Sequence, residues 1–161
     1  MKKFSLTDLL IFIVSTELVG AFSALLSGNF SIFYTEITRP PFSPPAWIFP
    51  VVWTVLYAIM GISAYMIYRS NNYKYKNALK IYIIQLLVNF SWSIIFFKFR
   101  LLTFASIVAV LLALLVGLMI YIFCKIKKSA GLINIPYFLW SLFASYLAIG
   151  TAILNQTKTL P

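Results

Sequence analysis

The chain has 161 residues, of which 62% are apolar and only 10% are charged. Soluble domains are about half apolar and about a quarter charged, and a soluble fold of this length cannot hide so much apolar surface. A bilayer accommodates it, because lipid is then the solvent for the apolar side chains. The composition therefore indicates an integral membrane protein.

The composition also limits the chemistry. There is no histidine, the one cysteine is Cys124, and the acidic residues are Asp8, Glu17 and Glu36. This set argues against a histidine-ligated haem, a zinc site, a Ser-His-Asp triad and a disulfide within the chain. We expect no metal site and no resident cofactor. The net charge is +10, and the basic residues lie between apolar runs. We therefore expect these residues to contact anionic lipid rather than nucleic acid.

Five stretches approach the length of about 20 mostly apolar residues that a spanning helix needs. They are residues 6–26, 46–68, 81–97, 101–124 and 132–154. No long linker, low-complexity tract or evident repeat separates them. We therefore expect an all-α integral membrane protein in which residues 1–161 form a single five-helix transmembrane domain.

The basic residues predict the orientation. The N-terminal side of the spans carries Lys2, Lys3, Arg69, Lys74, Lys76, Lys80, Lys125, Lys127 and Lys128, and the opposite side carries Arg39, Lys98, Arg100 and Lys158. By the positive-inside rule, the N-terminus faces the cytoplasm and the C-terminus lies outside. Alternatively, Met1-Lys2-Lys3 and the apolar run that follows could form a signal peptide that is cleaved off. The length of the apolar run and Glu17 within it argue against cleavage.

Residues 39–47 read RPPFSPPAW and lie in the first loop. Four prolines within six residues impose a stiff, extended path before the second helix. One interpretation is a rigid loop with Trp47 as an anchor at the membrane interface. The other is a lid over the mouth of the bundle. The sequence leaves both open.

Three predicted helices each carry aromatic and polar or small side chains on one face. These are Trp53 and Tyr57 in the second, Gln85, Asn89, Trp92, Ser93 and Phe96 in the third, and Trp140, Ala144 and Leu147 in the fifth. Because polar groups in lipid are costly, the faces should point inward. They either pack the core through amide hydrogen bonds or form the aromatic walls of a pocket for a flat ligand.

Two further features have open interpretations. Glu17 lies in the middle of the first span, where a carboxylate is either functional or bonded to a partner such as Gln85 or a tyrosine. Small residues recur every four positions, where they serve either packing within the bundle or a dimer interface. These residues are Ala105, Ala109, Ala113 and Gly117 in the fourth span, and Gly20, Ala24 and Gly28 at the end of the first.

Several segments together resemble the translocator protein / tryptophan-rich sensory protein family (TspO/MBR, or peripheral benzodiazepine receptor). They are Phe33-Tyr34, Arg39-Pro40, Phe42-Ser43-Pro44-Pro45-Ala46-Trp47, Val52-Trp53-Thr54-Val55-Leu56-Tyr57, Met60-Gly61, Gln85, Asn89, Trp92-Ser93, Phe96-Phe97, Pro136-Tyr137, Trp140, Phe143-Ala144 and Leu154-Asn155. The resemblance spans all five predicted helices in order.

This resemblance implies a five-helix bundle, often a homodimer, that binds porphyrins such as protoporphyrin IX in an aromatic pocket. The ligand-binding residues it implies are Tyr34, Pro44, Trp53, Tyr57, Asn89, Trp92, Trp140 and Ala144. It also implies that Trp53 and Trp140 are the catalytic pair if the protein degrades porphyrin in light. The expected partners are a porphyrin or similar hydrophobic ligand, membrane lipid and a second copy of the chain.

The sequence departs from the family pattern at some positions. Phe33 replaces a usual tryptophan, and Ala148 stands where many members have asparagine. The cholesterol motif of animal members is missing from the fifth span, because Lys158 lies too far from Tyr146. The short loops and this basic C-terminus without the animal motif favour a bacterial plasma membrane.

Three functions follow from the resemblance. The first is a membrane receptor or sensor that binds porphyrins, with Arg39 as the partner of a ligand carboxylate. The alternative is a light-dependent porphyrin-degrading enzyme, in which Trp53 and Trp140 donate electrons or hydrogen atoms to the ligand. The third, a porphyrin or sterol transporter, is disfavoured because the spans hold few charges and no inverted repeat is evident.

Overall fold

The computed structural model describes residues 3–70 and 72–156. Within them, five helices are long and apolar enough to cross a membrane, which confirms the predicted fold class. The elements are α1 (Leu6–Ser27), α2 (Phe30–Glu36), α3 (Ile48–Arg69), α4 (Tyr75–Ser93), the π-helix η1 (Ile94–Lys98), α5 (Leu102–Ile126), α6 (Lys128–Leu132) and α7 (Ile135–Leu154). The spans are α1, α3, α4 with η1, α5, and α6 with α7.

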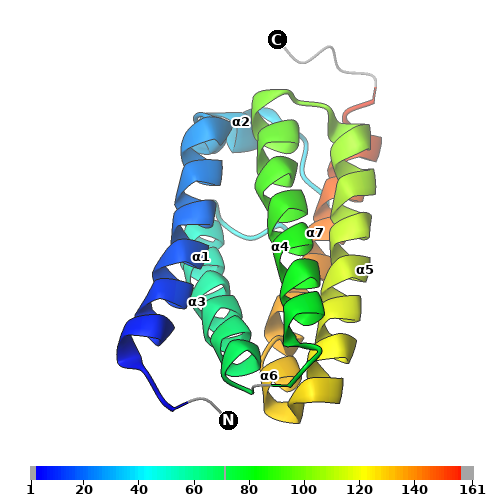
Figure 1. Ribbon diagram of the computed structural model, residues 1–161. Coiled ribbons are helices and arrows are strands. Elements are labelled where there is room, and N and C mark those ends of the chain that lie inside the picture. Colours follow the sequence, from blue (N-terminus) through cyan, green and yellow to red (C-terminus); the bar gives the residue numbers. More distant parts are fainter. Residues whose placement is uncertain (1–2, 71, 157–161) are drawn as a thin grey trace.

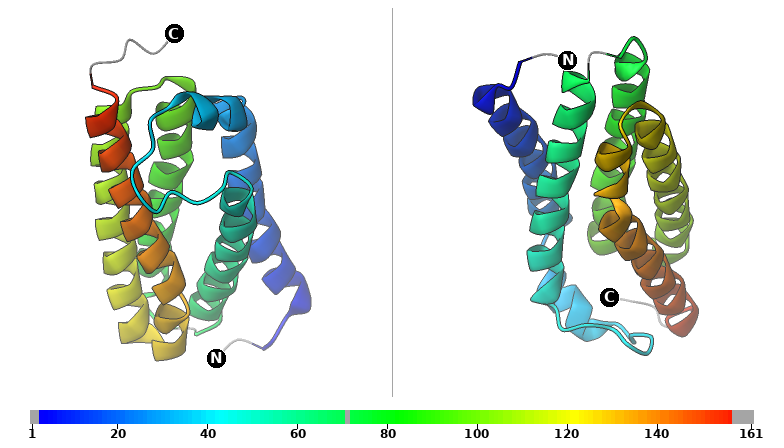
Figure 2. Two further views of the ribbon diagram at one scale, coloured as in Figure 1. Left: turned by 180° about the vertical axis from the view of Figure 1, so that it is seen from behind. Right: turned by 90° about the horizontal axis from the view of Figure 1, so that it is seen from below.

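The long helices run alternately up and down (Figure 1). Helix α1 packs along α3, α5 packs along α7, and α4 lies against α5. Seen along the bundle, α1 and α3 form one side and α4, α5 and α7 the other (Figure 2). The start of α1 and the end of α7 lie at opposite ends of the bundle (Figure 1).

The basic residues are divided unequally between these ends. The end near the start of α1 carries Lys3, Arg69, Lys74, Lys76, Lys80, Lys125, Lys127 and Lys128, and the other carries Arg39, Lys98 and Arg100. Lys2 and Lys158, which also entered the predicted charge balance, lie outside the described residues. The excess of basic residues at the end near the start of α1 is therefore present even when those two positions are left out.

Some helix ends differ from the predicted ones. Helix α4 begins at Tyr75 and not at residue 81, because exposed Lys76 and Lys80 belong to its first turns. Long lysine side chains extend from a helix end towards water, so hydropathy alone places the boundary too late. The first loop, where no helix was predicted, contains α2, which Asn29 caps by accepting a hydrogen bond from the Ile32 N–H at 3.4 Å.

Glycines allow α1 and α3 to approach closely. A Cβ atom at Gly61 would lie 2.7 Å from the Cα atom of Ile13, and one at Gly20 would overlap the Tyr57 ring. A side chain at Gly61 would therefore separate the helices, and one at Gly20 would displace the Tyr57 ring. Gly20, which belongs to the stripe of small residues at the end of the first span, therefore contributes to packing within the bundle.

The stripe on α5 also faces inward. Ala105, Ala109 and Ala113 are buried, and a Cβ atom at Gly117 would lie 3.3 Å from the Phe138 ring of α7. Small side chains on the inward face of α5 let the neighbouring helices approach closely, and at Gly117 the neighbour is α7. The stripe therefore gives no support to a dimer interface on α5.

Buried amides join three helices at the centre. The Tyr137 hydroxyl donates to Gln85 Oε1 at 2.7 Å and accepts from Asn89 Nδ2 at 3.0 Å. The Tyr57 hydroxyl donates to Asn89 Oδ1 at 3.4 Å. The suggested pairing of Glu17 with Gln85 is wrong, because Gln85 bonds to Tyr137 and Glu17 is only half-buried.

Candidate functional site

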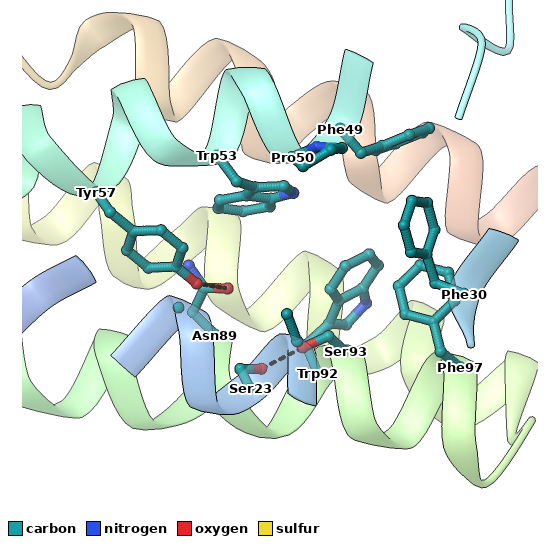
Figure 3. A pocket seen from close by; sticks show the side chains of 12 residues that line it. Ser23, Phe30, Phe49, Pro50, Trp53, Tyr57, Asn89, Trp92, Ser93 and Phe97 are labelled. Atoms are coloured by element: carbon teal, nitrogen blue, oxygen red, sulfur yellow. Dashed lines mark hydrogen bonds between the residues drawn. The ribbon is translucent and has the colours of Figure 1, made fainter. Parts of the chain in front are cut away.

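Two cavities lie side by side in the half of the bundle that contains α2. The first, called the α1 cavity, has a volume of about 130 Å³ and lies between α1, α3 and α4. Trp53 and Trp92 stand on opposite sides of it, and Tyr57 and Asn89 close one end (Figure 3). Ser23 from α1 is hydrogen-bonded to Ser93 from α4 at its edge (Figure 3).

The second cavity, called the α7 cavity, lies between α3, α4 and α7 and measures about 30 Å³. Trp140 and Ala144 from α7 line it, Tyr34 comes from α2, and Arg39 and Ser43 come from the segment after α2. A volume of this size accommodates about one water molecule. The space is therefore nearly filled by its own side chains.

Four aromatic residues separate the cavities, because Phe49, Trp53, Trp92 and Phe97 line both of them. Phe49 contacts the Trp140 ring edge-to-face, with centroids 6.0 Å apart. Every lining residue that the two cavities share is aromatic. Movement of aromatic side chains would therefore join the two spaces.

The predicted site residues are divided between these cavities. Trp53 and Trp92 line both, Tyr57 and Asn89 line the α1 cavity, and Tyr34, Trp140 and Ala144 line the α7 cavity. Pro44 lines neither of them. Its carbonyl accepts the Tyr34 hydroxyl at 2.5 Å and so holds that ring in place.

Several residues that line the cavities were not among the predicted binding residues, and Phe49, Ser23 and Phe97 illustrate why. Phe49 lies one turn before Trp53 on the same face of α3, and this spacing was a usable signal. Ser23 had no such signal, since a lone serine in an apolar helix is common. Phe97 owes its position to the π-helix η1, whose extra residue per turn hydropathy does not reveal.

The segment after α2 runs along α7 and covers the α7 cavity. Thr38 and Asn155 exchange two hydrogen bonds, from the Thr38 N–H to Oδ1 at 3.0 Å and from Nδ2 to the Thr38 carbonyl at 2.9 Å. Further along, the Tyr146 hydroxyl donates to the Pro41 carbonyl at 3.0 Å. The arrangement supports the interpretation of residues 39–47 as a lid.

Arg39 places a positive charge in the segment that covers the α7 cavity. Its guanidinium stacks over the Tyr34 ring, 4.8 Å from the ring centroid, and Arg39 lines the α7 cavity together with Ser43.

Trp47 lies outside the site. It is 66% exposed and lines neither cavity. Three of the four tryptophans of the chain therefore belong to the site.

The tryptophans differ in how firmly they are held. The Trp92 indole N–H donates to the Ala105 carbonyl at 3.1 Å, and its ring stacks on Phe96. The indole nitrogen of Trp140 is buried but has no hydrogen-bond partner. Since a buried N–H without a partner is costly, Trp140 offers a free donor to a ligand.

The described residues hold no group of three or more Cys, Asp or Glu side chains placed for a metal. The site instead combines aromatic walls with a few polar groups. This composition is typical of a site for a flat organic molecule.

The amino-acid sequence matches the TspO/MBR family over residues 10–154. The chain belongs to this family. It is 34% identical over 129 residues to the tryptophan-rich protein TspO of Chlorobaculum tepidum, covering 78% of this chain and 80% of that protein. It is 32% identical over 156 residues to the protein CrtK of Rhodobacter capsulatus, covering 94% of each.

A vertebrate protein is similar as well. The translocator protein of Bos taurus is 30% identical over 117 residues, covering 71% of this chain and 69% of that protein. The matched TspO/MBR region includes all five long helices almost completely. Both cavities therefore lie within the family fold, since their lining residues, from Gly20 to Thr151, fall inside the match.

Proposed function

We propose that this TspO/MBR protein is a membrane receptor for flat hydrophobic ligands of the porphyrin class, with protoporphyrin IX as the first candidate. The observation that carries the proposal is the aromatic partition of Phe49, Trp53, Trp92 and Phe97 between two adjacent cavities. Aromatic side chains offer large apolar faces to a macrocycle. Both cavities are smaller than the about 300 Å³ at which ligand pockets usually begin, so binding requires this partition to move.

Polar groups at the site fit the edge of such a ligand. Arg39 supplies a cation at the cover for a carboxylate. Trp140 supplies a free N–H inside, and Asn89 lies at the far end of the α1 cavity. A macrocycle across the partition would therefore meet donors at both ends.

The test is a titration of the purified protein in lipid vesicles with protoporphyrin IX in the dark, followed by porphyrin absorption and fluorescence. We expect a saturable spectral change that exceeds the change seen with an unrelated five-helix membrane protein. A signal that rises linearly with porphyrin, as simple partitioning into lipid does, would refute the proposal.

A second candidate function is light-dependent degradation of the bound porphyrin. It is favoured by the placement of Trp53 and Trp140 on the same cavity and by Tyr137, whose ring lies 6.2 Å from Trp53. Indole side chains can donate electrons to a photoexcited ligand, so the photochemistry would be that of the porphyrin. Loss of the porphyrin absorption bands in light, but not in the dark, tests this function.

We also propose that the N-terminus faces the cytoplasm of a bacterial cell. The basic residues at the N-terminal end of the bundle support this orientation through the positive-inside rule. An alkaline phosphatase fused to the C-terminus should then be active in bacteria, whereas an inactive fusion would indicate the reverse orientation.

A further inference from the structure

A groove opens between α3 and α7 on the outside of the bundle. It has a volume of about 470 Å³, and every residue that lines it is apolar. Val51 and Val55 from α3 and Leu139 from α7 are each more than half exposed at its rim. Helix α3 packs along α1 and α7 packs along α5, so neither closes the space between them. In a membrane this groove faces hydrocarbon.

Trp140 forms the boundary between the groove and the interior. It is the one residue that lines both this groove and the α7 cavity among those described. The two spaces therefore meet at Trp140, and the groove adjoins the candidate ligand site at this residue.

No hydrogen bond fixes the Trp140 ring in the described structure, since its indole nitrogen has no partner. Its aromatic neighbours are Phe49 on the cavity side, with centroids 6.0 Å apart, and Phe143 on the groove side, with centroids 5.5 Å apart. Ala144, one turn further along α7, leaves space beside it. Trp92, whose N–H is bonded to Ala105, has no such freedom.

The route from the aqueous end is more firmly closed. The covering segment is held on α7 by the paired bonds of Thr38 and Asn155 and by the bond from Tyr146 to Pro41. Pro40 also lies so close to Gly150 that a Cβ atom there would be 2.7 Å from it. Several contacts must break together for a ligand to pass this segment.

Building on the proposed function, we propose that a flat hydrophobic ligand dissolved in the bilayer first binds in the α3–α7 groove and reaches the α7 cavity past Trp140. Rotation of the indole ring joins the groove to the cavity. The free indole N–H then donates to an acceptor on the ligand. The groove is thus a membrane-side binding site that precedes the interior one.

Kinetics with protoporphyrin IX distinguish this route from one through the loop. We substitute Val55→Trp to fill the groove, and Leu114→Trp on α5, which is 68% exposed and lies outside the groove, as the matched control. The porphyrin is preloaded in the vesicles, and its fluorescence reports association and dissociation. An obstruction on the path slows both directions equally, so we expect Val55→Trp to reduce both rates about fivefold or more, with Kd changed less than about twofold.

The control variant should keep the rates of the unmodified protein. Leu139→Trp fills the groove from the α7 side and should repeat the effect of Val55→Trp, which guards against a folding defect in one variant. Unchanged rates in both groove variants would overturn the inference, and faster binding in Asn155→Ala would then identify the loop route. Absence of saturable binding to the unmodified protein would instead overturn the proposed function, and this inference with it.

Discussion

Thr38 and Asn155, which are 117 positions apart in sequence, exchange two hydrogen bonds at the end of the bundle that contains α2. Asn155 Nδ2 also donates to the Thr151 carbonyl at 2.7 Å, so the side chain joins the covering segment to the last turn of α7. The Asn155 amide is therefore one of the contacts that hold the covering segment on α7.

Removing this amide should loosen the lid. We expect Asn155→Ala to increase hydrogen exchange of the Thr38 amide, and of the other non-proline amides up to Ser43, by about tenfold or more, because the protecting contacts are lost while the core remains intact. Hydrogen exchange with mass spectrometry checks this. Asn155→Asp, which accepts from the Thr38 N–H but cannot donate back, should be intermediate. Equal exchange rates in the unmodified protein and in both variants would show that Asn155 does not hold the covering segment.

The central hydrogen-bond network should stabilise the bundle. Tyr137→Phe leaves Gln85 Oε1 without the donor seen here, and a buried polar group without its partner costs about 1–3 kcal/mol. We therefore expect a lower melting temperature in detergent. Tyr121→Phe, at a tyrosine that is 60% exposed, is the control and should have little effect. Equal melting temperatures for the two variants would show that the network contributes little.

The contact of α1 with α3 should depend on Gly61. A Cβ atom there meets backbone, with the Phe12 carbonyl at 2.8 Å, and backbone cannot rotate away. We expect Gly61→Ala to destabilise the protein by about 1–3 kcal/mol through overpacking. Gly117→Ala meets only the Phe138 ring at 3.3 Å, and a ring can shift. If thermal denaturation ranks Gly117→Ala as the more damaging variant, this account of the helix contact is wrong.

Arg39 should select ligands that carry carboxylates. We expect Arg39→Ala to weaken the binding of protoporphyrin IX by about three- to tenfold, the range for a charge-assisted contact that is partly exposed to water. Binding of the dimethyl ester of the same porphyrin should not change, because it has no charge to pair. Parallel titrations with the two porphyrins measure this. An equal loss for both would mean that Arg39 acts through the lid and not through the carboxylate.

Much of the fold could be predicted because the apolar runs are long. The inward faces also followed from spacing, since Trp53 and Tyr57 are separated by one helical turn, and both line a cavity. The start of α4 could not be placed, because Lys76 and Lys80 lower the hydropathy of a segment that is helical. Helix α2 was missed because seven residues carry too little periodicity within a loop.

The details of the site depended on tertiary contacts that the sequence does not encode locally. Division into two cavities depends on Phe49 and on the π-helix that places Phe97. The sequence suggested Gln85 as one hydrogen-bond partner of Glu17. In the structure, Gln85 is instead bonded to Tyr137, 52 positions further along the chain. Which buried polar groups pair depends on how the helices are rotated, and a single helix pattern does not determine this.

The central claim is that aromatic side chains lining the two cavities bind a porphyrin. Its most direct test is the dark titration with protoporphyrin IX of three matched variants, Trp53→Phe, Trp140→Phe and Trp47→Phe. We predict that the first two weaken binding by about three- to tenfold, since each loses aromatic contact with the ligand, and that Trp47→Phe, outside both cavities, binds like the unmodified protein. Affinities of Trp53→Phe and Trp140→Phe equal to that of the unmodified protein, or a loss confined to Trp47→Phe, would contradict the account.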